Sequence, residues 1–387
     1  MKLDRSEDQT AVADLARSIC EDHCSIEVVR EQEDHAQGCA ESFGAALREA
    51  GLLGTFVPEA LGGTPIGMLE NVAMYEEFGR ALAPSPHFGS SVVAALAIAG
   101  CADAPLREQA LTAIASGEWV VAPAWLEPDC GFEPEGVQLR AEPVDGGVRL
   151  NGSKRHIFFA GMAQKLLVLA RTGEAANAVD LFLVDAGAPG VALTQELSMA
   201  ADTQYRVEFS NVTVSDDACL SKGGTGWARW HDAVMQGVIL DAARAVGLAR
   251  RALEITVQYA QDREQFGKPI GAFQAIGHYL ADCSTLVDGA ALLVNEAAWA
   301  HAEGRPYQTL AASAKLFACN TAQEVTVKAQ QIHGGIGFTM EYDIQLFFRR
   351  AKQQQMNWLD TRRLEELVAE AVLDRGEEVA VADPFAA

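Results

Sequence analysis

A long apolar stripe in the second half of the chain is the feature that most constrains its fold. Seven apolar residues recur at three- and four-residue spacing over about six helical turns: Ile239, Ala242, Val246, Ala249, Leu253, Val257 and Ala260. A helix of this length cannot bury such a face by itself, so it requires partner helices. Two more long helical patterns follow, in "AALLVNEAAWAHAEG" and "TLAASAKLFACNTAQEVTVKAQQIHGG". The pattern predicts four packed helices in this part of the chain.

The periodicity is different in the preceding region. Apolar residues at three- and four-residue spacing predict helices in the N-terminal part. The period then becomes two, and "VQLRAEPVDGGVRLNG" predicts a β-hairpin that turns at Asp145-Gly146-Gly147. Three further strands are predicted in "KLLVLART", "DLFLVDA" and "YRVEFSNVTVS". We therefore predict a mostly α-helical α+β fold, with an N-terminal helical domain (1–117), a middle antiparallel β-barrel or sandwich domain (118–222) and a C-terminal four-helix bundle domain (223–387).

Composition and charge exclude several classes of function. The 387-residue chain has a formal net charge of −23, which would repel nucleic acids and anionic membranes. We expect no signal peptide and no membrane span, because no apolar segment has the required flanks or length. Cys20, His23 and Cys24 lie together, but no second cluster completes a zinc site, so we expect no metal. The eight cysteines follow no repeated spacing, which fits a reducing cytoplasm.

A glycine-rich segment between two helical stretches suggests ligand binding. "QIHGGIGFT" (331–339) contains three glycines and follows a helical pattern rather than a strand. Glycines let backbone N–H groups approach an anion closely, and the start of a following helix favours negative charge. The sequence leaves one alternative open, which is a glycine hinge between two helices.

Several segments together resemble the acyl-CoA dehydrogenase family. They are "GLLGTFVPEALGG", "YAQDREQFGKPIGAFQAIGHYLAD" (259–282), and "QIHGGIGFT" followed by "FFRRAK" (347–352). The resemblance implies FAD bound across a subunit interface, with the flavin on the β domain of one subunit and the pyrophosphate and adenosine on the C-terminal domain of its neighbour. It assigns the latter contacts to Arg263, Gln265, Phe266, Ile270, Gln274, Gln331, His333, Gly334 and Gly335.

The flavin side of the expected site departs from the family pattern. Members carry a Thr-Glu-Pro segment followed by Gly-Ser, and then an aromatic-Ile-Thr step. Leu126 and Phe132 stand where the first threonine and the serine are expected, and Phe158 stands at the second threonine. These three side chains offer no hydrogen-bonding group, so contacts with flavin N5, O4 and N3 would have to come from the backbone.

The catalytic base departs from the pattern as well. Dehydrogenation of an acyl-CoA needs a carboxylate to remove the α-proton while hydride leaves Cβ, and burial raises the pKa of that carboxylate toward the working pH. One usual position, six residues after the Arg-x-Ala-Lys segment, is Trp358, and the other is Gly237. Asp241 and Asp360 are the candidate substitutes. The alternatives are an ion pair with Arg244 for Asp241, and helix capping or an arginine pair for Asp360.

The sequence leaves three functions open. The first is a base-lacking subunit of a heteromeric acyl-CoA dehydrogenase, which completes a cofactor site shared with another chain and resembles the actinobacterial-type steroid enzymes. The second is a self-sufficient homotetramer that oxidises an acyl-CoA or acyl-carrier thioester with Asp241 or Asp360. The third is a non-dehydrogenase relative, either monooxygenase-like or non-catalytic.

The resemblance also implies the surroundings of the protein. It implies a homo- or hetero-oligomer, either a dimer or a tetramer and in the heteromeric case α2β2, because two subunits share each cofactor. Electron-transfer flavoprotein would accept the electrons, in the context of lipid metabolism. Aromatic residues that either line a substrate pocket or belong to the core are Phe88, Trp125, Trp230 and Trp358.

Overall fold

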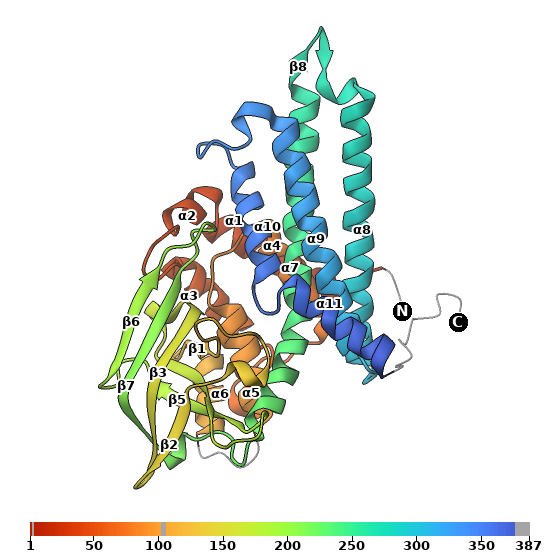
Figure 1. The fold of residues 1–387 in the computed structure, drawn as a ribbon. Coiled ribbons are helices and arrows are strands. Elements are labelled where there is room, and N and C mark those ends of the chain that lie inside the picture. Colours follow the sequence, from red (N-terminus) through yellow and green to blue (C-terminus); the bar gives the residue numbers. More distant parts are fainter. Residues whose placement is uncertain (2–3, 102–105, 376–387) are drawn as a thin grey trace. The chain divides into compact units, whose positions relative to one another are not determined.

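The computed structural model describes residues 1, 4–101 and 106–375, and these form two compact units. The helical unit comprises Met1–Ile26, Gly67–Ala83 and the chain from Val238 onward. The sheet unit comprises Glu27–Ile66 and Pro84–Gly237. Each unit is therefore assembled from segments that lie far apart in the sequence (Figure 1).

The helical unit is built on three long helices. These are α7 (Gly226–Asp262), whose first residues belong to the sheet unit, α8 (Gln274–Ala302) and α9 (Gln308–His333) (Figure 1). The hairpin β8 (Glu264–Gln265) and β9 (Lys268–Pro269) joins α7 to α8. The shorter helices of the unit are α1 (Glu7–His23), α4 (Met68–Arg80), α10 (Ile344–Met356) and α11 (Thr361–Ala369).

The apolar stripe of α7 is buried for the greater part of its length. Its first four residues have no exposed surface: Ile239, Ala242, Val246 and Ala249. Nearer the end of the helix, Leu253 and Val257 are half-buried. The burial of this stripe supplies the hydrophobic free energy that holds the long helix in the bundle. The predicted helical bundle is present.

Two glycines allow α4 and α7 to approach closely. A Cβ at Gly79 would lie 2.0 Å from the Arg244 carbonyl oxygen, and one at Gly247 would lie 1.9 Å from the Glu76 carbonyl oxygen. Any side chain at either position would push the two helix backbones apart. This contact sets the positions of Glu76 and Arg244, both of which belong to charged clusters described below.

The sheet unit contains the seven strands β1 to β7. They are β1 (Val121–Ala124), β2 (Arg140–Val144), β3 (Gly147–Phe158), β4 (Lys165–Arg171), β5 (Val179–Asp185), β6 (Val191–Glu196) and β7 (Gln204–Ser215). Its helices include α3 (Glu41–Glu49), α5 (Ala95–Ala99), α6 (Arg107–Ala115) and the π-helical segment Phe88–Ala94. The short helix α2 (Ile26–Glu31) begins at the border of the two units.

The seven strands form one sheet in the order β1-β4-β2-β3-β7-β6, with β5 paired to β4. Most pairs are antiparallel, but β1 runs parallel to β4, and β2 meets β4 in parallel at Arg140 and Arg171. The sheet is therefore mixed, whereas the sequence predicted an antiparallel one. Its apolar core includes Leu150, Leu166, Phe182 and Val207, and β6 adds the partly buried Val191 and Leu193.

The predicted hairpin is present but its first strand is shorter than expected. β2 begins at Arg140, although Val137 and Leu139 continue the alternation before it. The backbone N–H groups of Gln138 and Leu139 donate to the Glu127 carboxylate, so a side chain has replaced a neighbouring strand as their acceptor. β1 and β6 were not predicted, because β1 is short and contains a proline and β6 is a half-buried edge strand.

Within the described residues, no helix combines the length and the apolar character needed to cross a bilayer.

Candidate active site and cofactor contacts

An aromatic cluster joins the ends of α7 and α9. The rings of Tyr259 and His333 stack with their centroids 4.2 Å apart, and Tyr342 packs against His333 at 5.0 Å. His333 Nδ1 lies 2.7 Å from the Ala329 carbonyl oxygen, which makes Nδ1 the protonated nitrogen of a neutral ring. Burial lowers the pKa of His333 and keeps it neutral. This cluster brings the Arg263 segment and the glycine-rich segment to the same end of the bundle.

The Arg263 segment is exposed and turns sharply. Phe266 and Gly267 take φ values of +54° and +77°, as a two-residue hairpin turn requires. Phe266 is 93% exposed, and its ring meets that of Phe273 edge-on with the centroids 6.1 Å apart. The Arg263 guanidinium is also exposed, and it makes no hydrogen bond or ion pair to any residue that the structure describes. The segment after α7 therefore carries an exposed guanidinium, that of Arg263, and an exposed aromatic ring, that of Phe266.

The three glycines of residues 331–339 serve different purposes. Gly334 has φ +65° and ψ −138°, a conformation that is essentially restricted to glycine. A Cβ at Gly337 would lie 2.6 Å from the Gln330 carbonyl oxygen, so Gly337 closes the turn. Gly335 has neither constraint, and a Cβ there would meet no atom within 4 Å. The fold itself does not need a glycine at position 335, which leaves the exposed backbone open to an approaching ligand.

The residues at this end of the bundle fit the pyrophosphate and adenosine of FAD. Arg263 supplies a positive charge, the Gly334–Gly335 backbone is accessible, and Gln265, Gln274 and Gln331 are exposed amides. Ile270 is half-buried beside them. His333 differs from the rest, because its ring is buried and packs between tyrosines instead of facing solvent. Its part in such a site is to hold the two segments together.

A buried ion pair fixes the segment expected on the flavin side. Lys154 on β3 and the Glu127 carboxylate lie 2.7 Å apart, and Lys154 Nζ also donates to the Trp125 carbonyl oxygen at 3.2 Å. The same carboxylate accepts the backbone N–H groups of Gln138 and Leu139, each at 2.9 Å. Burial lowers the pKa of Lys154, and Glu127 opposes that shift. The Trp125–Glu127 backbone is thus held in one place.

The side chains of this wall do not fit a flavin. Leu126, Phe132 and Phe158 are half-buried and carry no polar atom beyond the backbone. The Leu126 carbonyl oxygen already accepts the Arg155 N–H at 2.9 Å. Hydrogen bonds to a flavin ring on this chain would depend on the remaining backbone groups.

The expected base position on α7, Gly237, is packed with apolar side chains. A Cβ at Gly237 would lie 3.1 Å from Val93 Cγ2 and 3.3 Å from Phe88 Cζ, so a longer side chain would displace its neighbours. Two turns earlier on the same face of α7, Trp230 packs against Trp125 with ring centroids 5.2 Å apart. These aromatic residues belong to the core of the sheet unit.

The other expected base position holds a buried tryptophan. Trp358 is 7% exposed and has φ +57°, and Leu359 follows with φ +112°. Two consecutive residues other than glycine in this region indicate a backbone that its surroundings hold under strain.

Asp241 lies in a closed cluster of charges. Its side chain is fully buried, with Oδ1 2.5 Å from Arg244 Nη2 and Oδ2 2.9 Å from Lys315 Nζ on α9. Burial alone would raise the pKa of Asp241, but Lys315 and Arg244 outweigh it, and the pKa lies below its ordinary value. A carboxylate with so low a proton affinity is a poor general base.

Asp360 caps a helix. It is the N-cap of α11 and its carboxylate accepts the Arg363 backbone N–H at 2.9 Å. The Arg363 guanidinium pairs with Glu366 and Glu370 instead. Of the two roles that the sequence left open besides catalysis, helix capping is the one that this geometry shows.

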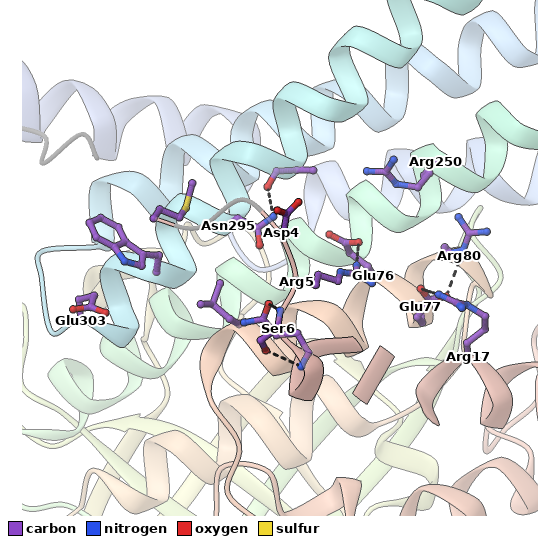
Figure 2. A pocket seen from close by; sticks show the side chains of 15 residues that line it. Asp4, Arg5, Ser6, Arg17, Glu76, Glu77, Arg80, Arg250, Asn295 and Glu303 are labelled. Carbon is purple, nitrogen blue, oxygen red and sulfur yellow. Dashed lines mark hydrogen bonds and ion pairs between the residues drawn. The ribbon is translucent and has the colours of Figure 1, made fainter. Parts of the chain in front are cut away.

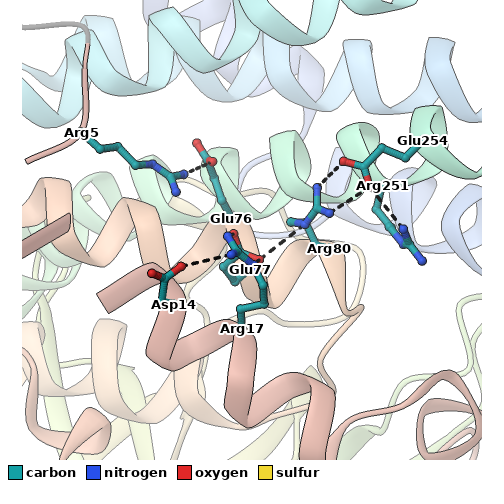
Figure 3. Close-up of polar contacts among 8 residues, drawn as sticks. All are labelled: Arg5, Asp14, Arg17, Glu76, Glu77, Arg80, Arg251 and Glu254. Carbon is teal, nitrogen blue, oxygen red and sulfur yellow. Dashed lines mark hydrogen bonds and ion pairs between the residues drawn. The ribbon is translucent and has the colours of Figure 1, made fainter. Parts of the chain in front are cut away.

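A separate cavity of about 960 Å³ lies within the helical unit, between the N-terminal segment, α4, α7 and α8 (Figure 2). Arg5 pairs with Glu76 at 2.5 Å, and Arg17 with Glu77 at 2.9 Å. Arg80 continues the series of ion pairs to Glu254 at 2.7 Å (Figure 3). None of the nine predicted FAD contacts is among the described residues that line the cavity. The cavity is thus separate from the predicted FAD contacts.

Glu76 should make stability depend on pH. Burial raises its pKa above the ordinary 4.5 despite Arg5 and Arg250, so the native state binds the proton more readily than the unfolded state does. The contribution of Glu76 is greatest in acid and is lost as the pH rises through its native pKa. We expect the stability of the wild type relative to Glu76→Gln to fall as the pH rises above the ordinary pKa of 4.5. Urea unfolding at a series of pH values measures this difference, and a difference that grows with pH would contradict it.

Sequence reasoning missed Lys154 and Lys315, which are the two fully buried lysines among the residues that the structure describes. A signal for Lys315 was present, because it stands in the apolar run "AASAKLFA" of a long helix. Lysine is almost never fully buried unless it is paired, so its placement on such a face indicates a carboxylate partner. The sequence does not show which carboxylate that is.

Comparisons with known proteins agree with the geometry. Three family models match successive parts of the chain: "Acyl-CoA dehydrogenase, N-terminal domain" over residues 6–118, "middle domain" over 122–212 and "C-terminal domain" over 224–356. Acyl-CoA dehydrogenase FadE27 of Mycobacterium tuberculosis is 32% identical over 349 residues, which cover 88% of this chain and 90% of that protein.

Solved structures show the same similarity. Butyryl-CoA dehydrogenase from Megasphaera elsdenii superposes with a TM-score of 0.90 at 28% identity, covering 96% of this chain and 100% of the other. A chain of the ChsE4–ChsE5 complex from Mycobacterium tuberculosis has a TM-score of 0.87 at 27% identity, with coverages of 98% and 100%. The fold predicted from the sequence is confirmed, and the chain belongs to the acyl-CoA dehydrogenase family of FAD-dependent oxidoreductases that act on CH–CH groups.

Proposed function

We propose that this acyl-CoA dehydrogenase chain works as a subunit that completes an FAD site shared with a different, base-bearing chain. The observation that carries the proposal is the state of the base positions. Trp358 and Gly237 have no carboxylate, Asp241 is neutralised by two cations, and Asp360 caps a helix. No carboxylate at these four positions is free to take the α-proton of an acyl-CoA.

The two halves of the expected cofactor site also support a site that is shared with a different chain. Except for the buried His333 and the half-buried Ile270, the adenosine-end residues lie exposed at one end of the bundle, where a neighbouring subunit could reach them. The flavin-side wall of this chain presents Leu126, Phe132 and Phe158 in place of hydrogen-bonding side chains. When FAD is bound, it supplies the hydride acceptor. This chain would contribute charge and open backbone to the pyrophosphate end.

The FAD content of the chain purified alone tests the proposal. We expect well under one FAD per chain after denaturation, together with a folded oligomer that gains FAD when a base-bearing partner is co-expressed. A stable homomer with one FAD per chain and activity on acyl-CoA would overturn it. ChsE4–ChsE5, a neighbour in structure, is a complex of two different proteins, which favours a heteromer here, and we propose α2β2 as its composition.

Arg263 should be required for cofactor affinity in the assembled protein. Loss of one charge-assisted contact to a phosphate typically weakens binding by about 1.5–3 kcal/mol, or roughly 10- to 150-fold. We expect Arg263→Ala to lower FAD affinity by this factor, measured by fluorescence titration of the apoprotein. Arg362→Ala is the matched control, since Arg362 is exposed and pairs only with Glu366 among the described residues. Equal FAD affinity in both variants would exclude Arg263 from the site.

The self-sufficient enzyme is the second candidate, and the full burial of Asp241 one turn after Gly237 is what favours it. In that case Asp241→Asn or Asp360→Asn would slow reduction of bound flavin by acyl-CoA at least about a hundredfold. Stopped-flow absorbance on each variant measures the rate. Electron-transfer flavoprotein as the acceptor and a steroid side-chain thioester as the substrate are further proposals, which coupled assays with each would test.

A further inference from the structure

The Asp241–Lys315 pair joins two helices in a place without water. Both side chains are fully buried, one on α7 and the other on α9, and the nearest charged atoms lie 2.9 Å apart. Removing two charges from water is costly, and buried hydrophobic residues of similar size are often no less stable. The pair is therefore not explained by stability alone, and its further contacts become informative.

Lys315 makes one such contact, to the segment that stands at the expected base position. Its ammonium group donates to the Asn357 carbonyl oxygen, and Asn357 directly precedes Trp358. One turn further along α9, Cys319 Sγ lies 3.5 Å from the Gln354 carbonyl oxygen in the last turn of α10. Helix α9 thus holds the chain where α10 ends.

The segment that Lys315 holds is strained and is tied down at both ends. Trp358 and Leu359 both have positive φ, and such conformations persist only where the surroundings enforce them. Lys315 holds the Asn357 end, and the Asp360 cap on the Arg363 N–H holds the other end. Between these two anchors the Trp358 side chain stays 7% exposed.

We infer that Lys315, oriented by Asp241, positions the Asn357–Asp360 segment and thereby keeps Trp358 buried at the place of the family's catalytic carboxylate. Asp241 then orients the ammonium group instead of removing a substrate proton, and Arg244 balances its remaining oxygen. Lys315 thus contacts both Asp241 and Asn357, the residue that directly precedes Trp358. This inference deepens the proposed function and rests on it, because both assume that this chain has no catalytic carboxylate.

Two variants separate positioning from stability. Lys315→Met leaves Asp241 short of a cation and is expected to destabilise the whole protein. The double variant Asp241→Asn with Lys315→Met removes both buried charges, so much of the global stability should return. The Asn357 carbonyl still lacks its donor in the double variant. Lys328→Met is the control, because Lys328 lies on the same helix and pairs with Glu324 at the surface.

Hydrogen exchange of the full-length protein, followed by mass spectrometry, gives the decisive measurement. In the double variant we expect peptides covering Asn357–Leu364 to exchange at least about tenfold faster than in the wild type, while α8 stays protected. Tryptophan emission, taken as the difference between each protein and its Trp358→Phe counterpart, should shift to the red. If hydrogen exchange and tryptophan emission in the double variant return to wild-type values together with the global stability, then Lys315 does not position this segment, and the inference is wrong. The FAD content of the wild type tests the proposed function independently.

Discussion

Replacing Lys154 by methionine is expected to cost about 3–5 kcal/mol of unfolding free energy, the largest effect that we predict for a single substitution. Lys154 has no exposed surface, and its ammonium group neutralises Glu127 at 2.7 Å. Methionine fills the space but leaves the Glu127 carboxylate largely buried beside apolar residues without its cation. Urea unfolding at neutral pH, compared with the wild type, measures the loss.

A double variant shows whether the charge is the cause. In Glu127→Gln with Lys154→Met the glutamine side-chain oxygen can still accept the N–H groups of Gln138 and Leu139, and no buried charge remains. We expect it to recover more than half of the loss. A single variant within about 1 kcal/mol of the wild type would mean that water reaches Glu127, contrary to its burial. The site would be affected too, because the same lysine holds the Trp125 carbonyl.

His87 should make the protein sensitive to acid by about 3 kcal/mol. Burial lowers its pKa from 6.5 to about 4, against the opposing effect of the Leu52 carbonyl, whose oxygen lies 2.9 Å from Nε2. The unfolded chain therefore takes up the proton at a higher pH than the native state. The contribution of a neutral His87 is complete above about pH 6.5 and is lost as the pH falls toward about 4, at about 1.4 kcal/mol per pKa unit.

A glutamine at position 87 isolates this effect. Gln can donate to the Leu52 carbonyl but does not titrate, and the carboxylates that also respond to acid are common to both proteins. We expect the unfolding free energy of the wild type, relative to His87→Gln, to drop by about 3 kcal/mol between about pH 7 and about pH 4. His278→Gln, at an exposed position on α8, is the matched control for the substitution itself. A flat difference for His87 would show that this imidazole is solvated.

The sequence predicted the helical bundle and the hairpin because both depend on local periodicity. The stripe from Ile239 to Ala249 is buried as the three- and four-residue spacing requires. The strand β1 and the parallel pairing of β1 with β4 were not predictable in this way, since pairing between distant strands leaves no periodic signal. The start of β2 at Arg140 depends on the Glu127 carboxylate, which is also distant in sequence.

For the candidate site too, the sequence predicted some features and only the tertiary structure showed the others. The sequence alone showed the family motifs and the missing carboxylates at Trp358 and Gly237, and the residues expected to meet the pyrophosphate remain a prediction from it. Only the tertiary structure decided that Asp241 is neutralised by Lys315, that Asp360 caps a helix, and that His333 packs inside a tyrosine pair. The physical reason is that the proton affinity of a carboxylate depends on the charges and solvent around it, and helix packing brings those charges from parts of the chain that no local pattern connects.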